Sequence, residues 1–309
     1  MAAPQNRTLR LNESDRVRLR AQLLTLKQPN HFQQIVNQTI HQDLFETLPY
    51  LPAQCASLIF VDPPYNLNKD FGGNRFQEMT MEGYAEWLNQ WLPGLLVTAQ
   101  PTATVYICGD WRSSPAIHQI ASKYLTVRNR ITWEREKGRG AARNWKSASE
   151  DIFFCTVGNK YCFNLDAVKI RRRVLAPYRD KEGAPKDWKS TSEGDFRDTH
   201  PSNIWTDLTV PFWSMAENTD HPAQKPEKLL AKLILASTNP GDVVLDPFLG
   251  SGTTSVVAKK LGRQWIGIEQ DLEYCLLAGK RLEQAEQDKR IQGYELGCFW
   301  ERNTRKSAK

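Results

Sequence analysis

The sequence Asp62-Pro63-Pro64-Tyr65 places a carboxylate, two prolines and a phenol directly after an apolar run, residues 57–61, of strand length. The Asp62 carboxylate and the Pro63 carbonyl are hydrogen-bond acceptors, and a proline has no backbone N–H to compete with them. Such a corner can accept both N–H bonds of an aromatic amine, which turns the nitrogen lone pair towards an electrophile. Tyr65 offers a ring face on which a planar base can stack. The simpler interpretation is a rigid Pro-Pro turn beside a core tyrosine, which leaves the acid without a task.

A second motif, Asp246-Pro247-Phe248-Leu249-Gly250-Ser251-Gly252, follows another apolar run, residues 243–245. Its two glycines allow a tight turn and a close approach of the backbone to a ligand. A helix is expected to begin near Thr253, and the free N–H groups of its first turn would point at the same ligand. The motif therefore indicates a nucleotide-like cofactor at the end of this second strand.

Glu269 stands 17 residues beyond Gly252, at the end of a further apolar run, residues 265–268. An acid in this position can accept hydrogen bonds from both ribose hydroxyls of an adenosine. A lone Gly-x-Gly turn and a surface glutamate more often bind nothing, but strand, glycines, helix, strand and acid together favour a nucleoside. A P-loop is excluded, because the glycines are not followed by Gly-Lys-Ser or Gly-Lys-Thr.

The two motifs together resemble those of the DNA amino-methyltransferases, which transfer a methyl group from S-adenosylmethionine to the exocyclic amine of adenine or cytosine. Asp62-Pro63-Pro64-Tyr65 matches the catalytic motif of that family, and residues 246–252 match its cofactor motif. The catalytic motif comes first and a variable region separates the two, an order similar to that of the permuted β class. The resemblance covers about residues 41–285. It implies S-adenosylmethionine as cofactor, double-stranded DNA as partner, no metal, and direct transfer without a covalent enzyme intermediate.

Two smaller matches carry further residues into the expected site. The segment His221-Pro222-Ala223-Gln224-Lys225-Pro226 resembles the one that lines the methionine end of the cofactor in this family, although alone it could be a helix start. Asp43 lies where the family has a residue near the cofactor adenine, although alone it could cap a helix ending near Leu48. The resemblance thus implies cofactor contacts from Asp43, Gln224, Lys225, Asp246, Phe248, Gly250, Gly252, Thr253 and Glu269.

Strand-length and helical segments alternate along the chain and would position both motifs. The expected strands are 57–61, 104–108, 152–157, 243–245 and 265–268, and the expected helices are 81–97, 113–124, 227–236, 253–261 and 272–287. This alternation predicts an α/β fold, a Rossmann-like, mostly parallel sheet with helices on both faces. Since ligands sit beyond the carboxyl ends of such strands, adjacent strands ending at Asp62 and Asp246 would bring amine and methyl donor together.

Five regions are expected along the chain. They are an N-terminal helical arm 1–30 with a helix at 13–27, the catalytic half 31–160, a target-recognition insertion 161–220, the cofactor-binding half 221–290, and a basic C-terminal tail 291–309. The insertion lacks a sustained period of two or of 3.6 residues, so it is expected to be irregular. It stands where the family carries its target-recognition region.

Positive charge is concentrated in one part of the chain. Residues 134–189 hold 14 Lys+Arg against 8 Asp+Glu, an excess equal to the net charge of +6 of the whole chain. A charge run is often only a solvated face, but its place in the target-recognition region favours contacts with DNA phosphates and base edges. The candidate residues are Lys137, Arg139, Arg143, Lys169, Arg171, Arg172 and Arg173.

Composition excludes several other classes. The six cysteines are scattered, without a Cys-x-x-Cys pair or histidines at metal-ligand spacing, so neither zinc nor a disulfide framework is predicted. The N-terminus is too charged for a signal peptide, and no apolar run approaches membrane-helix length. We expect a cytoplasmic protein associated with the nucleoid through DNA.

Three functions compete with the favoured one, adenine N6 methylation. Cytosine N4 methylation uses the same acceptor corner, although an Asp-first motif in this family more often accompanies adenine. Families with a similar motif that act on RNA bases or protein glutamine generally carry the cofactor motif upstream, the reverse of the order here. A DNA-binding protein with an inactive methyltransferase fold would have no need of Asp62, Tyr65 and both glycines. The sequence leaves open a homodimer and a companion restriction endonuclease.

Overall fold

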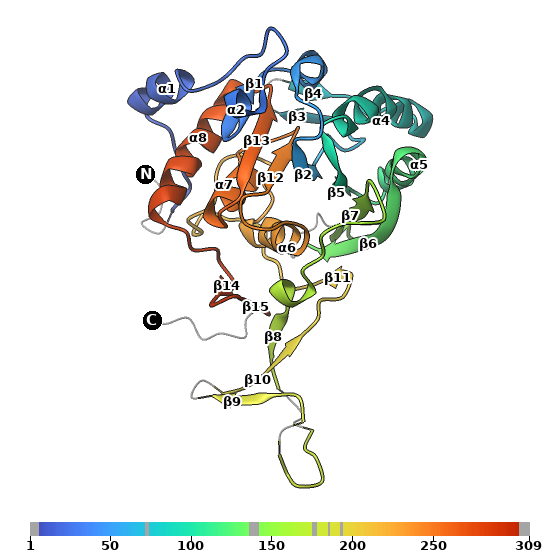
Figure 1. Ribbon diagram of the computed structural model, residues 1–309, viewed down its shortest axis with the longest axis vertical. Helices are drawn as coiled ribbons and strands as arrows, with labels where there is room; N and C mark the ends of the chain where they lie inside the picture. The colour runs from blue at the N-terminus through green and yellow to red at the C-terminus, as the bar shows by residue number, and fades with distance from the viewer. Residues whose placement is uncertain are drawn as a thin grey trace.

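The computed structural model describes residues 6–71, 74–135, 142–174, 178–184, 186–191 and 194–302. Within these residues eight strands form a central sheet in the order β1-β13-β12-β2-β5-β7-β6-β11 (Figure 1). In this order the strands are Gln38–His41, Gln264–Glu269, Val243–Asp246, Ala56–Val61, Ala99–Gly109, Ser149–Thr156, Thr126–Glu134 and Ile204–Trp205.

The pairing of these strands confirms the predicted mostly parallel sheet. β1, β13, β12, β2 and β5 are parallel to one another, as is β11 to β6. β7 is the exception, since it pairs antiparallel with both β5 and β6. Its amino end therefore lies at the same edge of the sheet as the carboxyl ends of β2, β5 and β12.

Helices cover both faces of this sheet because side chains alternate along each strand. In β2, Val61 packs into one core together with Trp91, whereas Phe60 packs on the opposite face together with Leu233. The principal helices are α4 (Met81–Leu96), α5 (Ser114–Tyr124), α6 (Glu227–Ser237), α7 (Thr253–Lys260) and α8 (Leu272–Gln287). Each begins and ends within one residue of the expected bounds.

The region before β2 forms short elements that pack on the main domain. They are α1 (Glu13–Arg20), α2 (Phe32–Ile35), α3 (Leu44–Thr47) and the 3-10 turn η1 (Leu48–Tyr50). The first helix is shorter than the expected 13–27: it ends at Arg20, and Leu24 then bridges to Ile40 alongside β1. α1 docks on α8, where Lys280 donates to Asp15 at 2.7 Å.

A second, five-stranded sheet differs most from expectation. Its order is β14-β15-β8-β10-β9, with strands Tyr294–Glu295, Cys298–Trp300, Ile170–Arg173, Gly194–Thr199 and Lys189–Thr191. The insertion expected to be irregular thus contains regular strands, and Figure 1 shows β8, β10 and β9 extending away from the main sheet as an arm. The expected tail 291–309 is also corrected, because β15 pairs in parallel with β8 and the chain is ordered into this sheet up to Trp300.

Three smaller elements complete the described chain: the 3-10 turn η2 (Leu165–Val168) and the hairpin β3 (Lys69–Phe71) and β4 (Asn74–Phe76). None of the helices in the described ranges is long and apolar enough to cross a bilayer.

A buried ionic cluster fixes the base of the arm to the main domain. The Asp207 carboxylate, just beyond β11, pairs with the ammonium groups of Lys228 and Lys232 of α6, each at 2.7 Å. Lys228 also donates to the carbonyl of Trp300 at 2.5 Å, and Lys232 lies 4.1 Å from the ring centre of Trp205. Burial lowers the pKa of Lys232 to about 8, although the carboxylate opposes this shift. The cluster joins α6, the end of the insertion and β15.

We predict that Asp207→Ala lowers the free energy of unfolding by about 3–5 kcal/mol, because it leaves two buried ammonium groups without their carboxylate. Urea unfolding followed by circular dichroism measures the loss. The matched control is Asp166→Ala, which removes an exposed carboxylate from an ion pair with Lys169 and is expected to leave the transition unchanged. Equal losses in the two variants would contradict the anchoring role of the cluster.

Candidate active site

The central sheet brings the ends of the two predicted motifs together. β2 and β12 are neighbouring parallel strands, with Val244 opposite Leu58, so Asp62 and Asp246 emerge at the same edge. A common cavity contains both motifs and the segment that precedes α6; it is lined by Phe60, Asp62, His221, Ala223, Gln224, Lys225, Asp246, Phe248, Leu249, Gly250, Ser251, Thr253 and Thr254. This edge is where open α/β sheets bind ligands.

At the catalytic corner Asp62 belongs to a cluster of ionisable side chains. The Tyr65 hydroxyl lies 3.0 Å from Oδ1 of Asp62 and 3.0 Å from Oε2 of Glu150, so its single proton can serve one carboxylate at a time. Nζ of Lys225 lies 2.6 Å from Oδ2 of Asp62 and 3.4 Å from Oε2 of Glu150. Arg135 donates to the other oxygen of Glu150 at 2.6 Å. Glu150 and Arg135 come from β7 and the end of β6, and sequence reasoning did not predict either.

Burial and pairing act against each other in this cluster. Burial raises the pKa of Asp62, and the Lys225 ammonium opposes it only in part. Burial also works to raise the pKa of Glu150, but Lys225 and Arg135 outweigh it and hold that pKa below its usual range. For Lys225, burial works to lower the pKa, yet the two carboxylates hold it above the usual lysine value. Lys225 is therefore a protonated donor shared between two acids.

Neighbouring elements hold the catalytic loop in place. The Tyr84 hydroxyl of α4 donates to the carbonyl of Pro64 at 2.9 Å. The Asn66 side chain donates to the carbonyl of Met79 at 2.9 Å and accepts from its N–H at 2.7 Å, while the Asn66 N–H donates to Ser113 Oγ. These bonds fix the backbone on both sides of Tyr65, which is the rigidity that an acceptor corner needs.

The cofactor motif forms a backbone cradle that only glycine permits. Gly250 and Gly252 have φ of 54° and 82°, in the left-handed region. A Cβ on Gly252 would lie 2.5 Å from Cβ of Ala278, and one on Gly250 would lie 2.9 Å from Nε2 of His221. Gly252 is also the N-cap of α7, so the first turn of that helix opens onto the cavity.

Arg281 of α8 forms hydrogen bonds with the cradle, and the sequence did not predict this role. Its guanidinium donates to the Ser251 carbonyl and to Thr253 Oγ1, both at 2.9 Å, and pairs with Glu227 of α6 at 3.1 Å. Thr253 in turn donates to the carbonyl of Lys225 at 3.1 Å. The cradle and Lys225 are thus parts of one hydrogen-bonded unit.

Two acids follow the cofactor strands as expected. Asp246 accepts from Thr254 Oγ1 at 2.5 Å and from the N–H of Phe248 at 3.0 Å, and burial raises its pKa to about 7. Glu269 accepts from the N–H groups of Gly250 at 2.7 Å and Asp271 at 2.9 Å, and burial raises its pKa also to about 7. Each Glu269 oxygen retains a lone pair that a ribose hydroxyl could use.

The remaining predicted cofactor residues form hydrogen bonds with other parts of the protein. Asp43 follows β1, whose last residue, His41, pairs with Glu269 in the sheet. Its carboxylate accepts from the N–H of Phe45 and caps α3. The Gln224 amide accepts from Thr219 and donates to the Glu217 carbonyl, so it fastens the loop before α6. Lys225, expected at the cofactor, donates to Asp62 of the predicted catalytic motif instead.

The predicted DNA-binding residues fall into two groups. On and before β8, Lys169 pairs with Asp166 and Arg171 with Asp198, each at 2.7 Å, and Arg172 lies 3.6 Å from Glu301. Arg173 belongs to the same strand. The second group lies on the β6–β7 connection, where Arg143 is exposed and Lys137 and Arg139 lie outside the described residues.

Two exposed tryptophans near the site were not predicted. Trp145 of the β6–β7 connection is 92% exposed, and the base of this connection is closed by a 2.7 Å bond from Arg135 N to Ala148 O, next to Glu150. Trp111, 58% exposed with Arg112 over its ring, follows β5, the parallel neighbour of β2. Aromatic and cationic groups therefore flank the catalytic edge of the sheet.

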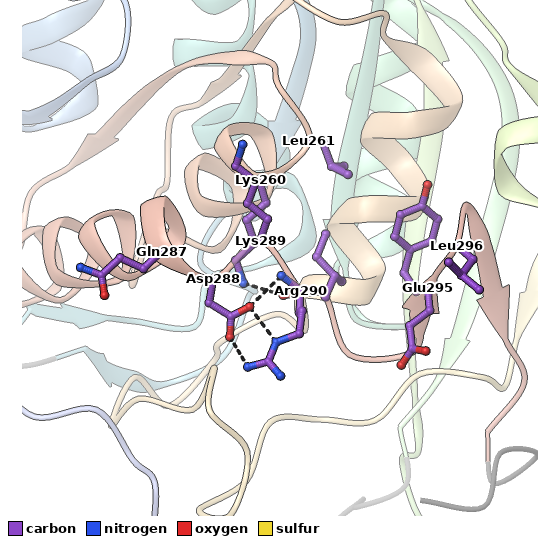
Figure 2. A pocket seen from close by; sticks show the side chains of 10 residues that line it. Lys260, Leu261, Gln287, Asp288, Lys289, Arg290, Glu295 and Leu296 are labelled. Carbon is purple, nitrogen blue, oxygen red and sulfur yellow. Dashed lines mark hydrogen bonds and ion pairs between the residues drawn. The ribbon is translucent and has the colours of Figure 1, made fainter. Parts of the chain in front are cut away.

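A larger hollow, about 690 Å³, lies away from both motifs, where α7 and α8 end near β14 (Figure 2). It is lined by Lys260, Leu261, Gln287, Asp288, Lys289, Arg290, Ile291, Tyr294, Glu295 and Leu296. Asp288 pairs with Arg290 at 2.6 Å, and Lys260 donates to the Arg290 carbonyl at 2.9 Å. None of the predicted site residues that the structure describes lines this hollow, so size alone does not make it a candidate.

A nucleoside cradle this close to an acceptor corner for an amine is the arrangement expected of a Rossmann-like methyltransferase that works on exocyclic amines. Residues 56–280 match the family model of the N6/N4 methyltransferases, described as DNA methylase, and the chain belongs to this family. It is an S-adenosylmethionine-dependent DNA methyltransferase.

Comparisons with individual proteins agree with the family model. The chain is 34% identical over 265 residues to the DNA adenine methyltransferase YhdJ of Escherichia coli (strain K12), covering 84% of this chain and 86% of YhdJ. It is 34% identical over 247 residues to the type II methyltransferase M.HpaI of Haemophilus parainfluenzae, covering 79% of this chain and 73% of M.HpaI. The crystal structure of an M1.HpyAVI–SAM complex superposes with a TM-score of 0.51 at 27% identity, covering 79% of this chain and 99% of that one.

The residues present fit S-adenosylmethionine. The left-handed glycines leave room for a ligand against the backbone, and Glu269 stands beside them as an acceptor. The buried Asp246 and the first turn of α7 complete the polar lining.

We predict that Gly252→Ala weakens S-adenosylmethionine binding at least tenfold, because its Cβ would collide with Ala278 and displace the cradle. Isothermal titration calorimetry measures the dissociation constant. Gly262→Ala is the control, since Gly262 also has a positive φ of 73° but no atom within 4 Å of a new Cβ. The control is expected to lose about 1 kcal/mol of stability to strain and to bind the cofactor normally. Unchanged binding in Gly252→Ala would contradict the position of the cradle.

Proposed function

We propose that this protein methylates adenine N6 at a specific sequence of double-stranded DNA. The observation that carries the proposal is the acceptor corner of Asp62 and Pro63 beside the glycine cradle, at the ends of neighbouring strands β2 and β12. The adenine is supported by the 34% identity to a protein named as a DNA adenine methyltransferase. Such an enzyme acts in the cytoplasm, where chromosomal DNA is accessible.

In the proposed reaction the protein binds and polarises the target amine. The base leaves the DNA stack and enters the corner beside Tyr65. The Asp62 carboxylate and the Pro63 carbonyl accept the two amine N–H bonds, so the nitrogen lone pair faces the cofactor. Bound S-adenosylmethionine supplies an electrophilic methyl group on a sulfonium. The negative charge of Asp62 stabilises the positive charge that develops on the nitrogen, and the methylated amine then loses one proton to water, which leaves it neutral.

DNA recognition is proposed for the arm and the β6–β7 connection. The cations of β8 already pair with acids, Arg171 with both oxygens of Asp198, so they would have to share or exchange those partners with phosphates. Arg143 and Trp145 lie on the connection that leads directly to Glu150 and Arg135. We therefore propose the connection, with Lys137, Arg139 and Arg143, for DNA contacts near the target base, and the arm, with Lys169, Arg171, Arg172 and Arg173, for more distant ones.

We predict N6-methyladenine in the DNA of cells that express the protein and lack other adenine methyltransferases, detected by mass spectrometry of digested nucleosides. Asp62→Ala should reduce transfer by about 10²–10³-fold or more, with the dissociation constant of S-adenosylmethionine within twofold of wild type. N4-methylcytosine without N6-methyladenine would overturn the choice of base. Wild-type turnover in Asp62→Ala would remove Asp62 from the mechanism.

A further inference from the structure

Asp62 already has two donors before any base arrives. Lys225 Nζ lies 2.6 Å from Oδ2, and the Tyr65 hydroxyl lies 3.0 Å from Oδ1. The Asp62 side chain is only 16% exposed, so without these donors the buried carboxylate would be costly to keep ionised. An ammonium in contact, however, cancels the negative charge with which Asp62 would stabilise the developing cation on the target amine. The contact with Lys225 that keeps Asp62 ionised thus also opposes the proposed function of Asp62.

Glu150 offers both donors an alternative partner. Its Oε2 lies 3.0 Å from the Tyr65 hydroxyl and 3.4 Å from Lys225 Nζ, while Arg135 holds its other oxygen at 2.6 Å. A small displacement of the Lys225 side chain and a rotation of the Tyr65 hydroxyl would transfer both contacts from Asp62 to Glu150. The Glu150 side chain is 6% exposed and ion-paired, so its position is fixed.

We propose that Lys225 occupies the place of the target amine at Asp62 and that Glu150 is a positioning residue that takes over Lys225 and Tyr65 when the base enters. This inference rests on the proposed function and assigns two further residues to its site. The Asp62 carboxylate can then accept from the target amine, and the Lys225 ammonium is paired with the Glu150 carboxylate. The cluster of Asp62, Glu150, Lys225 and Arg135 carries no net charge before or after the exchange, because two carboxylates face two cations.

Three of the other ionisable groups around Asp62, those of Tyr84, Cys108 and His221, carry no charge into this exchange. Among the described residues besides Glu150, Lys225 and Tyr65, the groups that act on Asp62 or on its partners are Lys69, Tyr84, Cys108, Arg135, His221 and Asp246. Burial lowers the pKa of His221 to about 3, so this side chain is neutral. Burial raises the pKa of Cys108 and of Tyr84 above their usual values, so both are neutral as well.

A double-mutant cycle of Glu150→Gln, Lys225→Met and the combined variant tests the proposal. Glu150→Gln leaves Lys225 on Asp62, and we expect kcat/KM for DNA to fall at least tenfold with the S-adenosylmethionine dissociation constant within twofold. Lys225→Met leaves two buried carboxylates facing each other, so the acid limb of the kcat profile should move to higher pH by a unit or more. The combined variant restores charge balance, and we expect kcat at pH 7.5 at least tenfold above that of Lys225→Met.

Asp151→Asn is the matched control. Asp151 is the next residue of β7 and also buried, but its carboxylate points to Ser114 and Thr132 at 2.8 and 2.9 Å. It should keep the wild-type kcat and pH profile. Wild-type turnover in Glu150→Gln, or losses that simply add in the combined variant, would overturn the inference while leaving the proposed function intact.

Failure of the proposed function and failure of the inference about Lys225 and Glu150 give different results. If the wild-type protein transfers no methyl group to DNA, the proposed function fails, and urea unfolding of the same four proteins still measures the coupling between Lys225 and Glu150. A coupling that is present at pH 8 and is lost as the pH falls through and below the usual glutamate range supports the shared ammonium, because Glu150 must be ionised to pair with it. Zero coupling at pH 8 excludes it.

Discussion

A carboxylate leaves water only where a cation or another hydrogen-bond donor compensates for its lost hydration, and the edge of this sheet buries or partly buries four of them. Asp62 and Glu150 share Lys225, Asp246 accepts from Thr254 and from a backbone N–H, and Glu269 accepts from two backbone N–H groups. The surrounding structure follows from these requirements. The cofactor motif, the segment before α6, the first residues of α7 and the N-cap of α8 supply these donors. Arg281 links Ser251 of the cofactor motif and Glu227 of α6 to α8.

The local chemistry of the site was readable from sequence because it is carried by contiguous motifs at strand ends. Apolar runs of strand length followed by Asp-Pro, and glycines followed by a helix, predicted β2, β12, α7 and β13 nearly to the residue. Neighbouring parallel strands have their carboxyl ends at the same edge of a sheet. The placement of Asp62 and Asp246 at one edge therefore followed from the predicted fold alone. The principal helices were equally clear. α4, α5 and α8 each bury one apolar side, whereas every residue of α6 is buried.

What the sequence could not reveal depends on contacts between distant segments. Glu150 is one acid in a charged stretch, and only the antiparallel pairing of β7 with β5 places it beside Asp62. β6 was missed because much of its outer surface is exposed, with arginines at alternate positions. The strands of the second sheet have two to six residues, too few to show a period, and the shortened α1 reflects docking of residue 24 along β1.

The second sheet is assembled from segments more than 120 residues apart, since β15 at the C-terminus lies against β8 of the insertion. An insertion flanked by the main domain would ordinarily be an exchangeable module, free to be swapped between relatives to change the DNA sequence that is read. Here β15 (Cys298–Trp300) supplies the strand that pairs with one edge of β8 in this module. A chimera that transfers only the insertion or only residues 291–302 would therefore carry an exposed, unpaired strand edge.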